Sequence, residues 1–103
     1  MVRVVRYYVG LSNKDGKLSE EQVNSLIKIV SGYFKGFTIY PAKGYWNGES
    51  EDTYVIEIID LGTPLKTFIN FEDSLSTWLK LTKQECILKL VVHGNTSFIN
   101  AEG

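Results

Sequence analysis

The sequence predicts an α+β fold in which two helices cover one face of a four-stranded antiparallel sheet. Three observations carry this prediction: four segments rich in β-forming residues, two segments with helical periodicity, and the order strand, helix, strand, strand, helix, strand. Right-handed crossovers place both helices of this order on the same side of one sheet. At 103 residues, we expect a single domain spanning 1–103.

The first strand and the first helix have clear signals. Residues 2–11 alternate with a period of two, which is typical of a half-buried strand. Ser19 and Gln22 have the spacing of a capping box, so a helix is expected from Glu20, with Gly36 marking its end. The apolar stripe of this helix recurs at three- and four-residue spacing: Val23, Leu26, Ile27, Val30 and Phe34.

Two strands, 36–46 and 52–60, follow as a hairpin around the segment KGYWNGESE. Pro41 lies inside the first of them and cannot donate to a ladder, which indicates an edge, a bulge or the end of the strand. We expect the strand to fray or bulge there.

The second helix is expected within 62–84, with Thr63 as N-cap, Pro64 at the first helical position and an irregularity near Asn70. A last strand follows over 85–95, and the remaining residues form an edge strand or a tail. The complete order is that of the ferredoxin-like sandwich.

Alternation assigns each strand residue to a face of the sheet. The predicted helix-facing set is Val5, Tyr7, Phe37, Ile39, Tyr54, Ile56, Ile58, Leu88, Leu90 and Val92. The opposite face then carries too many apolar side chains for open water, which predicts a homo-oligomer. The residues predicted to form the oligomer interface are Val4, Tyr40, Val55, Ile59, Ile87 and Val91.

Composition and charge exclude several classes of protein. Eleven basic and twelve acidic residues give a net charge of −1, so the chain lacks the excess of positive charge that binds the phosphate backbone of a nucleic-acid duplex. YYVGLS and KGFTIY resemble RNA-recognition motifs, but the second lies on the wrong strand. No apolar run is long enough to span a membrane, and the amino terminus is not a signal peptide. With a single cysteine, Cys86, a cytoplasmic protein is expected.

Catalytic chemistry has little support in the sequence. His93, the single histidine, ends a strand, and the glycine spacing of a phosphate-binding loop is absent. Glu49, Glu51 and Asp52 are more typical of a solvated hairpin tip than of a metal site. The sequence therefore predicts a non-enzymatic protein with no cofactor and no metal.

Trp46 is the strongest candidate for a binding residue, because glycines at 44 and 48 leave it in a mobile hairpin. Packing on the sheet edge or on a neighbouring subunit is the alternative role. The predicted ligand-binding set is Trp46, Tyr45, Lys43, Arg6 and Glu51, in which the rings stack on a ligand and the cations hold an anion.

The segments YYVGLS, LSEEQ, GFTIYPAKGYWNGESEDTYVIEI and KQECILKL together resemble small ferredoxin-like proteins of bacteria and their phages. That resemblance implies the fold and leaves two functional classes. One is an oligomeric binding protein, phage-encoded, that sequesters a nucleotide-like messenger of host immunity. The other is a protein–protein inhibitor or assembly adaptor that acts on a host protein.

Overall fold

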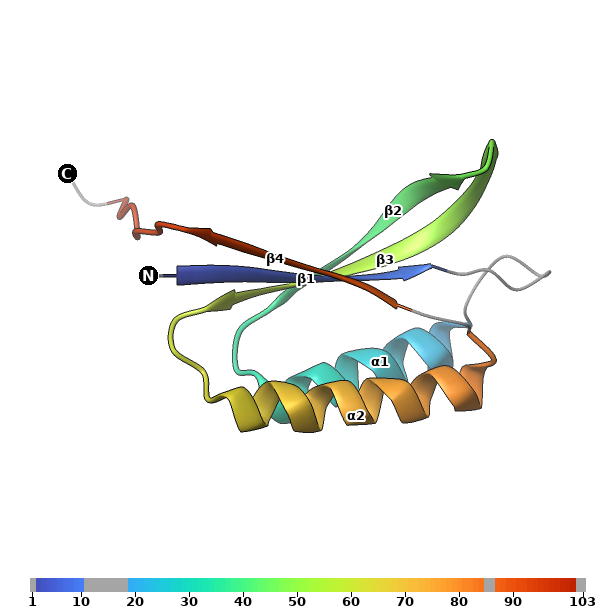
Figure 1. The fold of residues 1–103 in the computed structure, drawn as a ribbon, viewed down its shortest axis with the longest axis horizontal. Helices are drawn as coiled ribbons and strands as arrows, with labels where there is room; N and C mark the ends of the chain where they lie inside the picture. The colour runs from blue at the N-terminus through green and yellow to red at the C-terminus, as the bar shows by residue number, and fades with distance from the viewer. Residues whose placement is uncertain (1, 11–18, 85–86, 102–103) are drawn as a thin grey trace.

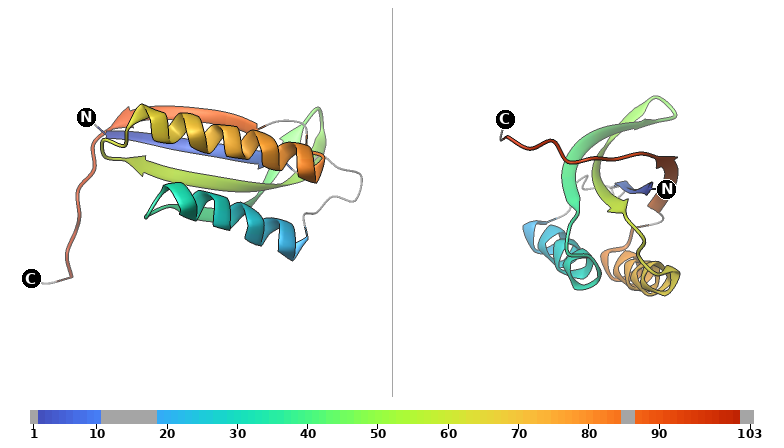
Figure 2. Two further views of the ribbon diagram at one scale, coloured as in Figure 1. Left: turned by 90° about the horizontal axis from the view of Figure 1, so that it is seen from below. Right: turned by 90° about the vertical axis from the view of Figure 1, so that its left-hand side faces the viewer.

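The computed structural model describes residues 2–10, 19–84 and 87–101, except the side chain of Trp46. Its elements are β1 (Val2–Gly10), α1 (Glu20–Tyr33), β2 (Thr38–Trp46), β3 (Glu49–Asp60), α2 (Leu65–Thr82) and β4 (Ile87–Gly94). The strands form one antiparallel sheet in the order β2-β3-β1-β4, and both helices lie on the same face (Figures 1 and 2). The predicted fold class is confirmed. None of the described helices is long and apolar enough to cross a membrane.

Helix α1 begins as predicted. The Ser19 hydroxyl oxygen accepts from the Gln22 amide at 3.1 Å, and the Gln22 side-chain oxygen accepts from the Ser19 amide at 2.9 Å. The predicted end at Gly36 is wrong, because the helix stops at Tyr33 and Phe34 adopts an extended backbone. The Phe34 ring is buried against two rings of α2, and this tertiary packing ends the helix before the glycine.

The β2–β3 hairpin confirms the predicted pair of strands but corrects the expectation at Pro41. Strand β2 continues through Pro41, which lies opposite Tyr54. Because β2 is an edge strand, the missing donor of proline can face solvent without breaking the ladder. Asn47 and Gly48 have φ values of 50° and 79°, which fit a two-residue type I′ turn.

Helix α2 begins at Leu65, so Pro64 is its N-cap and the predicted cap at Thr63 is wrong. The amides of Gly62 and Thr63 instead donate to the Asp60 carboxylate, at 3.0 and 2.7 Å. The helix is continuous past Asn70, where an irregularity was expected. Residues 95–100 have no regular structure, so the tail is the alternative that holds.

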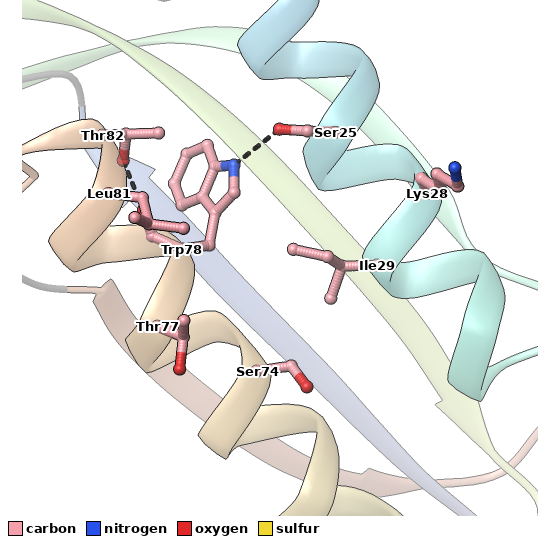
Figure 3. A pocket seen from close by; sticks show the side chains of 8 residues that line it. All are labelled: Ser25, Lys28, Ile29, Ser74, Thr77, Trp78, Leu81 and Thr82. Carbon is pink, nitrogen blue, oxygen red and sulfur yellow. Dashed lines mark hydrogen bonds between the residues drawn. The ribbon is translucent and has the colours of Figure 1, made fainter.

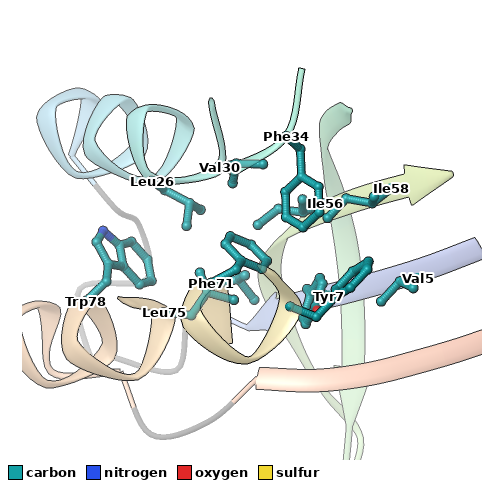
Figure 4. Packing of buried hydrophobic residues seen from close by; sticks show 12 residues of the cluster. Val5, Tyr7, Leu26, Val30, Phe34, Ile56, Ile58, Phe71, Leu75 and Trp78 are labelled. Carbon is teal, nitrogen blue, oxygen red and sulfur yellow. The ribbon is translucent and has the colours of Figure 1, made fainter. Parts of the chain in front are cut away.

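The core lies between the sheet and the two helices (Figure 4). Tyr7 of β1 meets the Phe71 ring of α2 edge to face, with 5.3 Å between the centroids. The Tyr7 hydroxyl donates to Glu72 at 2.7 Å, and Lys89 of β4 pairs with the same carboxylate. Burial, followed by the bond to Glu72, raises the pKa of Tyr7 far above its ordinary value. The core cluster is Val5, Tyr7, Val9, Leu26, Val30, Phe34, Ile56, Ile58, Phe68, Phe71, Leu75 and Trp78.

The face assignment of β4 is wrong. Val5 pairs with Val91 and Val9 with Ile87, so Ile87 and Val91 lie on the helix side and not on the uncovered face. Leu88, Leu90 and Val92 take the uncovered face in their place. The segment ILKLVV is apolar at both parities, so alternation cannot choose between the faces. A shift of one residue in the strand pairing exchanges the two faces, and only the pairing with β1 decides which side chains of β4 face the helices.

Replacing the helix cap tests the start of α1. Ser19→Ala should lower the free energy of unfolding by about 1 kcal/mol, because the Gln22 amide loses its acceptor. Leu26→Ala should cost about 2–5 kcal/mol, since that side chain is fully buried. Urea titration measures both losses, and Ser76→Ala on an exposed position of α2 is the control, expected within about 0.5 kcal/mol. A Ser19→Ala loss no larger than that of the control would contradict the capping role.

Asp60 should make stability depend on pH. Burial opposes its ionisation, but hydrogen bonds from Arg3 and from the amides of Gly62 and Thr63 outweigh burial and lower the pKa of the carboxyl below 3.8. A group with a depressed folded pKa stabilises the fold above its unfolded pKa, and this stabilisation is lost as pH falls through the folded pKa. Asp60→Asn should therefore be destabilising at neutral pH.

The difference between Asp60→Asn and the unmodified protein should begin to shrink below about pH 4, where the Asp60 carboxyl of the unfolded chain protonates, and should keep shrinking until the native carboxyl protonates at lower pH. Urea titrations at neutral pH and at about pH 3 measure it. An equal difference at both values would show that Asp60 contributes through shape and not through charge.

Candidate ligand site

The uncovered face of the sheet is arranged in rows that cross the strands. One apolar row joins Val92, Val4 and Ile59, and a second joins Leu88, Tyr8, Val55 and Tyr40. Between them, Arg6 of β1 lies opposite Glu57 of β3, with 2.6 Å between Nε and Oε1. Beyond the second row, the β2–β3 hairpin bends away from the helices (Figure 1). The uncovered face, so defined, is therefore both curved and mixed in polarity.

Glycines on both sides of β3 make room for two polar side chains on this face. Gly10 of β1 pairs with Thr53, and Gly44 of β2 pairs with Glu51. A Cβ atom at Gly10 would come within 2.7 Å of a Glu51 carboxylate oxygen, and one at Gly44 within 2.9 Å of the Thr53 hydroxyl. Both distances are shorter than side chains tolerate. The carboxylate and the hydroxyl thus lie against bare backbone at the base of the hairpin.

Val55 behaves differently from the other predicted interface residues. It lies between Tyr8 and Tyr40 in the second apolar row, and only 2% of its surface is exposed. The chain already buries this side chain, so Val55 is unavailable to a second subunit. Ile59 and Tyr40 on the same face stay about two-fifths exposed, at 44% and 40%.

The structure does not bring the predicted ligand-binding residues together. Arg6 and Glu51 lie on the uncovered face, and the backbone position of Trp46 falls on it by register, opposite Glu49. The side chain of Trp46 lies outside the described part of the structure. Lys43 and Tyr45 have the opposite parity and fall on the other face of the hairpin.

Both predicted anion-binding cations are neutralised by carboxylates. Lys43 pairs with Asp52 at 3.1 Å, and Arg6 pairs with Glu57. The hydrogen bond to Glu57 is the largest cause of the raised pKa of Arg6. These contacts make the uncovered face net acidic at its hairpin end, where Glu49 and Glu51 lie.

Sequence reasoning missed Thr53. It also missed that Gly10 lies opposite Thr53 and that Gly44 lies opposite Glu51. Their signal was available, since glycine inside a strand often marks a close approach to backbone. What the sequence does not show is which residues of β3 lie opposite Gly10 and Gly44, because that depends on register.

A second concave feature lies between the helices on the other side of the molecule (Figure 3). This helix groove has a volume of about 580 Å³ and is lined by Ser25, Lys28, Ile29, Ser74, Thr77, Trp78, Leu81 and Thr82. The indole nitrogen of Trp78 donates to the Ser25 hydroxyl at 2.9 Å. The hydroxyls of Ser25, Ser74, Thr77 and Thr82 bond within the chain, so apart from Lys28 the helix groove offers mainly apolar surface.

No family model matches the chain, and no curated protein matches it in sequence. Several solved structures share its fold. A phage SAM lyase in complex with S-methyl-5'-thioadenosine superposes with a TM-score of 0.62 at 22% identity, over 88% of this chain and 80% of that one. A DUF3240 family protein from Shewanella baltica gives 0.62 at 9% identity, over 95% and 97%.

CutA from Synechococcus elongatus, complexed with a Bis-Tris molecule, gives a TM-score of 0.58 at 12% identity, over 90% of this chain and 79% of that one. At these identities, the likeness establishes the small ferredoxin-like α+β fold that these proteins share with this chain.

Proposed function

We propose that the protein is a homo-oligomer that binds a small nucleoside-like molecule at the hairpin end of its uncovered face. The observation that carries this proposal is the close approach of Glu51 and Thr53 to Gly10 and Gly44. The missing Cβ atoms of Gly10 and Gly44 make room for Glu51, whose partly exposed carboxylate can supply the directional contact that a polar ligand needs, while Thr53 beside it is buried, at 7% exposed. The shared fold with a phage SAM lyase that holds S-methyl-5'-thioadenosine supports a nucleoside-like ligand.

Charge narrows the ligand class. The ammonium of Lys43 and the guanidinium of Arg6 are each paired with a carboxylate, whereas Glu49 and Glu51 lie on the uncovered face near the proposed site. A phosphate placed there would meet like charge. The site therefore suits a neutral or cationic nucleoside better than a nucleotide.

We propose binding without turnover. His93 lies opposite Arg3 at the other end of the sheet, far from Glu51 along the strands. A phage-encoded protein of this kind would act as a sponge, which holds a host signalling molecule and keeps it from its receptor. Inhibition of a host protein through the same uncovered face is the alternative role.

The oligomer is proposed from the apolar rows of the uncovered face. After the corrections at β4 and Val55, the exposed apolar side chains on it are Tyr40, Ile59, Leu88, Leu90 and Val92. Together with Val4 they form a patch of the kind that soluble monomers rarely leave open. A second subunit would cover it.

Calorimetric titration with adenosine and S-methyl-5'-thioadenosine tests the ligand site. Both should bind the unmodified protein, and adenosine monophosphate should bind more weakly because of its phosphate. Glu51→Gln should weaken nucleoside binding by about tenfold or more, the usual worth of a hydrogen bond to a charged group. Trp46→Ala should also weaken it if the indole stacks on the base, by about 1–3 kcal/mol.

Asp73→Asn, on an exposed position of α2, is the control and should leave affinity unchanged. Thermal melting of the same preparations should show all three variants folded. A Trp46→Ala variant that melts early yet binds normally would make Trp46 a packing residue. Unchanged affinity of Glu51→Gln for these nucleosides would contradict the site.

Ile59→Asp tests the oligomer. Burying an unpaired carboxylate in an apolar interface is costly, so this variant should sediment as a smaller species than the unmodified protein. Leu65→Asp, on an equally apolar but more exposed side chain of α2, should not change the sedimentation coefficient. If the unmodified protein is a monomer at micromolar concentration, the role assigned to the uncovered face is wrong.

A further inference from the structure

Strand β4 is an edge strand with apolar side chains on both faces. Leu88, Leu90 and Val92 face away from the helices, while Val91 faces the helix side and is still exposed. A strand that is apolar at both parities is typical of one buried on both faces. The fold covers neither the free edge of β4 nor its face away from the helices, although the apolar sequence of this strand is typical of a buried one.

The two edges of the sheet are protected unequally. Strand β2 carries Pro41, which has no amide hydrogen to donate to an added strand. Strand β4 has no proline and a single lysine, Lys89, which is already paired with Glu72 of α2. The unpaired amides and carbonyls of β4 are therefore the accessible template for a second strand.

We propose that two copies of the chain pair antiparallel through β4, about a two-fold axis perpendicular to the sheet. Such an axis keeps the uncovered faces of both copies on the same side of the extended sheet. Each residue of one β4 must therefore lie opposite a residue of the other β4 whose side chain points to the same face. Centring the pair on Leu90 places Leu90 opposite its own copy and Leu88 opposite Val92. The alternative centre at Val91 places Lys89 opposite His93, so it sets two basic side chains directly across from one another in place of apolar pairs.

The segment 95–101 supports the same arrangement. It leaves the end of β4 and extends away from the sheet and the helices (Figure 2), with Phe98 89% and Ile99 96% exposed. Two adjacent large apolar side chains in water are stabilised when they are buried against another apolar surface. We call this segment the arm.

The helix groove is the surface that fits the arm. Its hydroxyls are engaged within the chain: Ser25 accepts from Trp78, Thr82 donates to the Trp78 carbonyl at 2.8 Å, and Ser74 bonds to Tyr33 at 2.6 Å. The remaining surface comes largely from apolar groups, including Leu81, which is 78% exposed. A pair of apolar side chains suits it better than a polar ligand does.

The arm of a chain does not reach the Leu81 end of its own helix groove. The end of β4 lies beside the start of β1, where Arg3 stacks on Phe68 near the start of α2. Leu81 is thirteen residues farther along α2, about 20 Å away at 1.5 Å per residue. The four residues from Gly94 to Phe98 reach about 14 Å at most.

Antiparallel pairing removes this difficulty. It brings the end of β4 of one copy beside the start of β4 of the other, and that start follows closely on α2 in the chain. The arm then begins next to the second copy's Leu81 and Trp78. Edge pairing and arm docking thus form one interface, which is separate from the proposed ligand site and does not depend on it.

Cross-linking tests the pairing. Leu90→Cys and Tyr40→Cys, each made with Cys86→Ser and with Ile59→Asp to remove the face-to-face contact proposed above, place a thiol at two positions on the uncovered face that are equally exposed at 40%. A short bis-maleimide should convert Leu90→Cys into covalent dimer, since the two thiols meet at the two-fold axis, and should leave Tyr40→Cys as monomer. Cross-linking of both variants would favour face-to-face association, and cross-linking of neither would show that β4 stays unpaired. Either result overturns the proposal.

The arm is tested by the double variant Phe98→Ser and Ile99→Ser, with Ile69→Ser on α2 as the control. The double variant should raise the dissociation constant of the dimer by about tenfold or more, because two apolar side chains lose their cover. It should also bind adenosine as the unmodified protein does, which separates this interface from the ligand site. An unchanged dissociation constant, or an equal change in the control, would show that the arm does not dock.

Discussion

Strand β1 is the constraint on which the rest of the structure depends. It pairs with β3 on one side and β4 on the other, and Val5, Tyr7 and Val9 on its helix side are almost completely buried. Because side chains alternate, these three residues decide which face of each neighbouring strand meets the helices. The uncovered face, the rows across it and the accessible edge of β4 all follow from that choice.

Ion pairs at the periphery of the core join elements that are distant in sequence. Arg3 and Asp60 connect β1 to the end of β3, and Lys89 and Glu72 connect β4 to α2. These contacts position strands on the helix side of the sheet, and the Arg6–Glu57 pair on the uncovered face engages a cation that an anionic ligand would need. The charge that stabilises the fold therefore restricts what the uncovered face can bind.

The molecule separates its possible functions onto different surfaces. The base of the hairpin holds polar groups against bare backbone, two apolar rows flank the Arg6–Glu57 pair on the uncovered face, and the β4 edge with the arm and the helix groove forms a third surface. A small ligand, a second subunit and an exchanged arm can thus be accommodated together. Each surface can be altered by substitutions that leave the other two intact.

The sequence by itself determined the order of the elements, the capping box of α1, the hairpin and the fold class, because these depend on local periodicity and on turn and cap chemistry. It proposed Arg6 and Glu51 as binding residues, but it grouped them with Lys43 and Tyr45, which lie on the other face, because spacing along a hairpin does not show which face a residue takes. Only the tertiary structure decided the face of β4 and the burial of Val55 between two tyrosines. Both depend on strand register, which is a property of pairing between distant segments and leaves no mark on a segment with apolar side chains at both odd and even positions.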